Sequence, residues 1–359
     1  MTRFAFPCCF VLHCVVYSPG VSAQAPVPFY PDKTRLLFYL DEAGDEQAIT
    51  TPRLWLVRRD HILASMQQVM GHLPGDERRA PLEVVIHDTT AGEAFTRHSL
   101  SYAAEPGDRV PAYLLIPNEL SAPAAAVLCL HQTTRIGKDE PAGLGGLPNL
   151  HYAAELARRG FVTMCVDYPN FGTYEFDPYA HGYASATMKG IWNHMRAVDV
   201  LCERTEVDAE RIGVIGHSLG GHNSLFVAAF DERIRCIATS CGFNSFAHYY
   251  KGDLTGWSHD GYMPRIRQQY DRDPAKMPFD FTEVLAALAP RPVFINAPLG
   301  DGNFAVEGVR VCVRAAAPVY ALHHAKERLR AVYPDVGHDF PPNVREESYR
   351  WFERWLGEP

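Results

Sequence analysis

A serine lies between glycines in the segment RIGVIGHSLGGHNSLFVAAF, which covers residues 211–230. An apolar, strand-like run precedes Ser218, and a helix-like run follows it. Gly216 and Gly220 stand where side chains would clash in a sharp turn from a strand to a helix. Such a turn exposes the serine oxygen at the carboxyl edge of a sheet, beside the positive end of the helix. The pattern predicts a nucleophilic Ser218; the alternative is a Gly-Ser turn in an ordinary strand-to-helix loop.

A serine hydroxyl needs a general base, and the base needs a carboxylate that orients it. His338, in AVYPDVGHDFPP, follows the last predicted strand and precedes the last predicted helix, where such a base belongs. Asp301, in LGDGNF, follows the preceding strand in a glycine-rich turn. Asp335 and Asp339 are closer to His338 in sequence, but local aspartates more often cap a turn or a helix. We therefore predict a catalytic triad of Ser218, Asp301 and His338.

The negative oxygen of a tetrahedral intermediate needs backbone N–H donors. One donor is expected from Leu219, the residue after the nucleophile. The other is expected from Gln132, in the LHQTT segment that follows the first buried strand. His131, beside Gln132, is expected to organise this loop rather than to carry a proton. Together, these residues predict acyl transfer to water.

The elements that must position these residues alternate along the chain from about residue 120. Unbroken apolar strand patterns such as AAAVLCL and RPVFINAP are separated by helical patterns. This alternation is typical of a parallel sheet that helices cover on both faces. Residues 82–118 show strand signals separated by turns and are expected to add antiparallel edge strands. The predicted fold class is α/β, with a mostly parallel, eight-stranded sheet.

The first 23 residues have the order of a secretory signal peptide, with Arg3, an apolar stretch and small residues before Ala23. The apolar stretch is interrupted and falls short of the ~20 residues that a spanning helix needs, so no stable membrane anchor is expected. We therefore predict export, to the periplasm or the outside of the cell.

The remaining chain is divided into two parts. Residues 24–81 are predicted to form an N-terminal extension with a helix that begins after Thr51 and ends at Gly71. Residues 82–359 are predicted to form the catalytic domain. Residues 242–290 within it form an insertion near the active site.

Composition and charge limit the classes of partner. The chain has 359 residues, 47% of them hydrophobic, and a formal charge of −8 without a basic stripe, which argues against binding to nucleic acid. No spacing resembles a zinc site, and no metal or cofactor is predicted. Cys129, Cys165 and Cys236 lie in apolar runs and are expected to be buried. A disulfide within the set of Cys202, Cys241 and Cys312 is left open.

The motifs LHQTT, GHSLGG, PLGDGNF and GHDFPP together resemble those of the α/β-hydrolase superfamily, over roughly residues 82–357. Within it, the chain is similar to exported bacterial esterases grouped with dienelactone hydrolases, acetyl xylan esterases and the catalytic domain of prolyl oligopeptidases. The resemblance implies a serine esterase that needs no cofactor and acts on a small-molecule or carbohydrate ester. Dienelactone hydrolases use cysteine where this chain has Ser218, so a dienelactone is not the expected substrate.

Aromatic side chains near the predicted site are expected to line the substrate pocket, since insertions above the sheet edge usually do so. They are Tyr168, Phe171, Trp257 and Tyr262. A peptidase related to prolyl oligopeptidases is an alternative, although the roughly 80 residues before the core cannot build a propeller whose blades need about 40 residues each. A catalytically inactive binding protein is a further alternative, but no member of the triad is missing.

Overall fold

A nine-stranded sheet forms the centre of the computed structural model, which describes residues 27–357. The six strands at one side are mutually parallel, and the three at the other side are antiparallel to their neighbours. In spatial order the strands are β11 (Leu329–Val332), β10 (Val293–Asn296), β9 (Ile234–Ser240), β8 (Val207–His217), β6 (Ala124–Leu130), β7 (Val162–Val166), β5 (Asp108–Pro117), β4 (Phe95–Glu105) and β3 (Val85–Ala91).

The predicted α/β class is confirmed, but the expected count of eight strands is one too low. Residues 82–118 contribute three antiparallel strands, of which β3 forms the edge of the sheet. Every residue of β3 is exposed. The predicted antiparallel strands in this region are present, and only their number was left open by the sequence.

Helices cover both faces of the sheet because the buried strands carry apolar side chains in both directions. In β6, Leu128 packs into one core, and Val127 and Cys129 pack into the other. The first core takes side chains from α3 (Ala186–Cys202), α4 (Leu219–Phe230), α6 (Phe281–Ala287) and α7 (Val306–Leu322). The second takes side chains from α2 (Tyr152–Ala157) and α8 (Pro342–Leu356).

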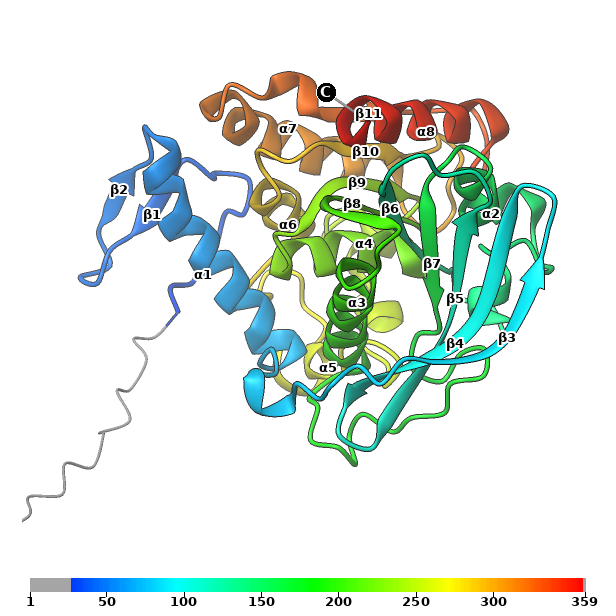
Figure 1. The fold of residues 1–359 in the computed structure, drawn as a ribbon. Coiled ribbons are helices and arrows are strands. Elements are labelled where there is room, and N and C mark those ends of the chain that lie inside the picture. Colours follow the sequence, from blue (N-terminus) through cyan, green and yellow to red (C-terminus); the bar gives the residue numbers. More distant parts are fainter. Residues whose placement is uncertain (1–26, 358–359) are drawn as a thin grey trace, which may run out of the picture.

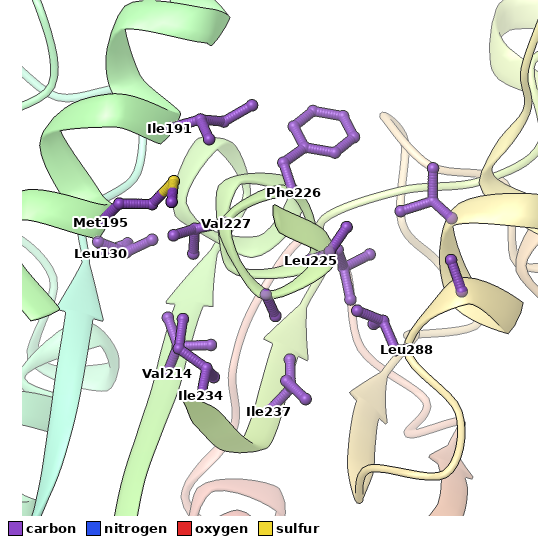
Figure 2. Close-up of a cluster of buried hydrophobic side chains, with 14 of the residues drawn as sticks. Leu130, Ile191, Met195, Val214, Leu225, Phe226, Val227, Ile234, Ile237 and Leu288 are labelled. Atoms are coloured by element: carbon purple, nitrogen blue, oxygen red, sulfur yellow. The ribbon is translucent and has the colours of Figure 1, made fainter. Parts of the chain in front are cut away.

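The helix that follows the predicted nucleophile is anchored from several sides. Figure 2 shows Leu225 and Val227 of α4 above Val214 and Ile237 of the neighbouring strands, with Ile191 of α3 beside them. All five side chains are fully buried. Since packing of this density resists displacement, α4 holds a fixed position relative to β8, the strand that leads into it.

The N-terminal part forms a two-stranded hairpin of β1 (Phe38–Leu40) and β2 (Glu46–Ala48), followed by α1 (Pro52–Met70). In Figure 1 this part, drawn in blue, lies at the side of the molecule. The Thr51 hydroxyl caps α1 by accepting from the Leu54 N–H, and Gly71 follows the helix at φ 98°, so the predicted helix is confirmed. Fully buried Arg58 of α1 forms a 2.6 Å ion pair with Glu283 of α6, which ties α1 to the main fold. The short α5 (Arg265–Gln269) also contacts α1.

Two further expectations concern cysteines and membranes. All six cysteines in residues 27–357 are free, so no disulfide links Cys202, Cys241 or Cys312. Cys129, Cys165 and Cys236 are fully buried, as predicted. No helix of the described chain has the length and apolar character to cross a membrane. The predicted signal peptide lies outside the described residues.

Candidate active site

Ser218 occupies the turn between β8 and α4 with a strained backbone. Its φ of 54° and ψ of −114° are unusual for a residue with a side chain. The Ser218 N–H donates to the Ser240 carbonyl at 2.8 Å, and the Ser218 carbonyl accepts from the His222 N–H at 3.2 Å. These contacts fix the turn, and Ser218 lines a pocket above it.

The two flanking glycines are required by the closeness of the backbone. A β-carbon at Gly216 would lie 2.2 Å from the carbonyl oxygen of Gly220, and one at Gly220 would lie 2.0 Å from that of Leu130. Both distances are far below van der Waals contact. The spacing of the two glycines therefore reflects a strand-to-helix turn of the predicted type.

The Gly216→Ala substitution is expected to lower the free energy of unfolding by about 3 kcal/mol, because the new methyl group overlaps backbone atoms that cannot move independently. Urea denaturation followed by circular dichroism measures the loss. Gly302→Ala is the control, since a β-carbon there would meet no atom within 4 Å; its effect should stay below about 1 kcal/mol. Equal effects of the two substitutions would contradict this account of the turn.

The predicted acid and base are in contact. His338 lies in the loop between β11 and α8, and its Nδ1 is 3.0 Å from each carboxylate oxygen of Asp301. Asp301 follows β10 in a tight turn, where it accepts from the N–H groups of Asn303 and Phe304 at 2.8 and 3.1 Å. The turn therefore aims the carboxylate at Nδ1 and leaves the opposite nitrogen of His338, Nε2, for the pocket.

The environment keeps Asp301 ionised. Burial raises the pKa of the Asp301 carboxyl, but the hydrogen bond and charge of His338, with the N–H groups of Asn303 and Phe304, outweigh burial and hold the pKa below the ordinary value of an aspartate. A carboxylate that stays negative near neutral pH stabilises a positive imidazolium on His338. Within the described chain, His338 makes no direct hydrogen bond to Ser218; such bonds are often long in unliganded sites.

The competing aspartates have other surroundings. The Asp339 carboxylate accepts from the Asn149 side-chain amide at 2.9 and 3.1 Å, which ties the loop of His338 to the loop before α2. Asp335 is exposed. Of the three aspartates considered from the sequence, only Asp301 contacts the ring of His338.

The loop with Gln132 is held by a buried histidine. Nε2 of His131 accepts from the Tyr168 N–H at 3.0 Å, so Nδ1 carries the proton and donates to the Gln132 carbonyl at 2.6 Å. The Gln132 side chain donates to Glu140 at 3.1 Å. His131 thus organises the loop, as its position in the sequence suggested, and Gln132 lines the same pocket as Ser218.

The pocket has a volume of about 350 Å³, at the small end of the range for ligand sites. It combines the predicted catalytic groups with aromatic walls from the insertion and from the turn after Asp301. Its lining residues are Gln132, Thr133, Ser218, His222, Tyr249, Gly256, Trp257, Tyr262, Asn303, Phe304 and His338.

Of the four aromatic residues predicted to line the pocket, two do so. Trp257 and Tyr262 are in its wall. Tyr168 is 2% exposed and donates its hydroxyl to the Gly261 carbonyl at 3.1 Å, so it supports the insertion from behind. Phe171 packs against the rings of His131 and Tyr168, outside the wall. Both residues lie in the loop after β7. The sequence of this loop does not show which of its side chains face the pocket and which pack behind it.

Sequence reasoning missed His222, which lies one helical turn after Ser218. It packs against Trp257 and Tyr262, and neither ring nitrogen has a hydrogen-bond partner within the described residues. Burial lowers the pKa of His222 to about 3, so the ring is neutral at physiological pH. The sequence signal that could have revealed His222 is its position four residues after Ser218, because this spacing puts both residues on one face of a helix.

Three possible metal-binding side chains lie close together behind the site. Donor atoms of His217, Cys241 and His338 are within 4.8 Å of one another. However, His338 is paired with Asp301, and burial raises the pKa of the Cys241 thiol, which keeps its sulfur protonated. We assign no metal to this group.

Comparisons with known proteins give matches to esterases. A family model described as glucuronyl esterase of fungi matches residues 171–323, which include Ser218 and Asp301. The carbohydrate esterase MZ0003, from an unknown prokaryotic organism, is 28% identical over 134 residues, or 35% of this chain and 31% of that protein. The chain thus aligns with less than a third of the length of this relative.

Two matches extend over most of the chain. YtaP of Bacillus subtilis, described as a hydrolase, is 25% identical over 263 residues, which are 69% of this chain and 84% of YtaP. A solved glucuronoyl esterase from Solibacter usitatus has a TM-score of 0.67 at 19% identity, covering 92% of this chain and 99% of that one. At this identity the structural match bears on the fold alone.

Proposed function

We propose that this chain, an α/β-hydrolase by its sheet, its nucleophile turn and its structural relatives, is a serine carboxylic ester hydrolase acting on a sugar ester. The observation that carries the proposal is the contact of Asp301 with His338, which lines the same pocket as Ser218. Matches to a glucuronyl esterase model and to a carbohydrate esterase support a sugar ester over the peptidase alternative.

In the first half of the reaction, the Ser218 oxygen attacks the carbonyl carbon of the ester, and its proton passes to Nε2 of His338. Asp301 stabilises the resulting imidazolium. The negative oxygen of the tetrahedral intermediate accepts from the N–H groups of Leu219 and Gln132. When the intermediate collapses, His338 returns the proton to the departing alcohol, and the acyl group remains on Ser218.

In the second half, water attacks the acyl-enzyme and gives a proton to His338. The second tetrahedral intermediate expels the Ser218 oxygen, which recovers this proton, and the carboxylic acid leaves. No metal or cofactor takes part in these steps. The leader sequence supports export of the protein, and the substrate would then be met outside the cytoplasm.

The sugar is proposed to lie against Trp257, Tyr262 and Phe304, the aromatic part of the pocket wall. Aromatic rings suit the apolar faces of a sugar, and Gln132, Thr133 and Asn303 in the same lining carry polar groups that suit its hydroxyl groups. The sugar can supply either the acid or the alcohol of the ester.

Matched pairs of esters test this substrate class. Methyl glucuronate is compared with methyl tetrahydropyran-2-carboxylate, which has the same ring without hydroxyl groups; an acetylated methyl xyloside is compared with cyclohexyl acetate. We expect the sugar ester of at least one pair to have a kcat/KM at least about 10-fold higher, the value of one or two hydrogen bonds to hydroxyls. Titration of the released acid measures all four rates.

The pair that shows the preference identifies whether the sugar is the acid or the alcohol. Equal rates within both pairs would overturn the proposal of a sugar ester. Faster cleavage of a chromogenic prolyl dipeptide than of any ester would instead favour a peptidase.

A further inference from the structure

A row of buried polar side chains crosses the sheet directly behind the predicted base. His217, Ser240 and Asn296 are the last residues of β8, β9 and β10, and they are register partners: His217 pairs with Ser240, and Ser240 with Asn296. All three are at most 1% exposed. Neighbouring strands lie about 4.8 Å apart, so register partners on one face can bond side chain to side chain.

The hydrogen bonds of this row lead to the peptide that follows the base. Asn296 Nδ2 donates to the Ser240 hydroxyl at 2.8 Å and to the Asp339 carbonyl at 2.9 Å. The Ser240 hydroxyl contacts Nδ1 of His217 at 2.9 Å. Because the Asp339 carbonyl can only accept, the nitrogen of the Asn296 amide must face it, and the orientation of the side chain is determined.

Each end of the row lies beside a predicted catalytic residue. His217 precedes Ser218 in the chain, and its ring packs edge to face on that of His338, with centroids 4.8 Å apart. Asp339 follows His338. Burial, with the nearby His338, lowers the pKa of His217 to about 3, so His217 is neutral and adds no charge beside the base.

Stability alone does not explain these side chains. Burying polar groups costs free energy even when they are bonded, and replacing both partners by apolar groups of the same shape is often neutral or stabilising. The other side chains of β10 that face the cores, Val293 and Ile295 on one side and Phe294 on the other, are apolar. We therefore expect the role of this polar row to lie in the site, which is at the same sheet edge, rather than in stability.

We propose that Asn296 and Ser240 are positioning residues for His338, an inference that rests on the proposed ester hydrolysis. Asn296 binds the Asp339 carbonyl, Ser240 accepts from Asn296 and holds its amide in place, and together they set the distance of the base from Ser218. The loop of His338 begins after β11, whereas Ser218 follows β8. The row connects this loop to the strands β8, β9 and β10 through side chains. Displacement of a catalytic group by about 1 Å can cost about 100-fold in rate.

The Asn296→Leu variant tests the proposal. It fills a similar volume and removes the hydrogen bonds that Asn296 donates to Ser240, to the Asp339 carbonyl and, weakly, to Cys241. We expect kcat to fall by roughly 10- to 100-fold while KM changes less than about threefold, because substrate binding is left intact. The rate of labelling of Ser218 by a fluorophosphonate is expected to fall with kcat. Thr163→Val is the control: Thr163 is fully buried in β7, and its hydroxyl donates only to the Ala153 carbonyl, at 3.1 Å.

A second pair of variants covers the case that Asn296→Leu does not fold. Ser240→Thr keeps the hydroxyl. Ser240→Val has the same shape as the threonine variant but lacks the hydroxyl. We expect the threonine variant to retain several-fold higher kcat than the valine variant at equal KM. A folded Asn296→Leu protein with unchanged kcat, or equal kcat in the two Ser240 variants, would overturn the inference. Neither result bears on the proposed ester hydrolysis, which is tested separately by the loss of Ser218 and by the matched esters.

Discussion

The Ser218→Ala variant is expected to lose about 10⁶-fold in kcat on its best ester, with little change in KM. Removal of the nucleophile from a serine triad abolishes the acyl-enzyme route, and what remains comes from binding and from the oxyanion donors. Steady-state kinetics with a sensitive assay for released alcohol measures the loss. The pocket wall is otherwise unchanged by this substitution, so substrate should still bind.

Ser348→Ala is the matched control for this prediction. Ser348 is also buried, but it lies in α8 and donates its hydroxyl to the Arg345 carbonyl at 2.7 Å, away from the pocket. Its kcat should stay within about twofold of the parent protein. If Ser218→Ala retained more than about 1% of the parent kcat, the acyl-enzyme mechanism would be abandoned.

The Asp301→Asn variant is expected to lose about 10⁴-fold in kcat, the effect of removing the orienting carboxylate from a triad. An asparagine amide can donate to Nδ1 of His338, which would put the ring proton on Nε2 and leave that nitrogen unable to accept from Ser218. The Asp301 turn should persist, because the asparagine oxygen can still accept from the N–H groups of Asn303 and Phe304.

The ionisation of Asp301 also determines how kcat/KM of the parent protein should depend on pH. Burial raises the pKa of the Asp301 carboxyl, but the hydrogen bond and charge of His338, with the N–H groups of Asn303 and Phe304, lower it below its ordinary value, so the carboxylate stays ionised down to the usual range of a carboxyl. Loss of activity as the pH falls from neutral toward about 4 should therefore occur without protonation of Asp301, with a slope of no more than 1 in log kcat/KM. A slope of 2 in that range would mean that Asp301 also titrates there.

Asp339→Asn is the control for the choice of acid. Asp339 is the aspartate next to His338 in the chain, and its carboxylate is bonded to Asn149 rather than to the base. We expect this variant to keep kcat within about 10-fold of the parent. A larger loss in Asp339→Asn than in Asp301→Asn would show that the acid is misassigned.

The sequence was sufficient to predict the features that depend on local chain geometry. A glycine on each side of Ser218 predicts a tight turn, and the structure has that turn, with positive φ at Ser218. Asp301 and His338 each follow a predicted strand at the same sheet edge, which predicts that they meet, and the structure brings them into contact. The α/β class followed from alternating strands and helices. The comparisons support an esterase over the peptidase alternative.

Features that depend on packing between distant segments were not predictable. Tyr168 and Phe171 carry the right side chains for a pocket, but the insertion covers Tyr168 by bonding to its hydroxyl through Gly261. His222 enters the pocket because Trp257 and Tyr262, more than 30 residues later, fold over it. The strand signals in residues 82–118 predicted antiparallel edge strands but did not give their number, and the sheet has nine strands rather than eight.

The polar row behind the base could not be predicted from the sequence either. His217, Ser240 and Asn296 end three separate strands, and each looks like an isolated polar residue in the sequence. Only the register of the parallel strands brings them side by side. Side-chain contacts across a parallel sheet depend on this register, which strand patterns alone do not specify.

The most direct test of the account is the mass of the protein after reaction with a fluorophosphonate probe. One probe molecule is expected to add to the protein, the modified peptide is expected to contain Ser218, and the Ser218→Ala protein is expected to gain no mass. Addition at another residue, or equal addition to the Ser218→Ala protein, would contradict the assignment of Ser218 as the nucleophile.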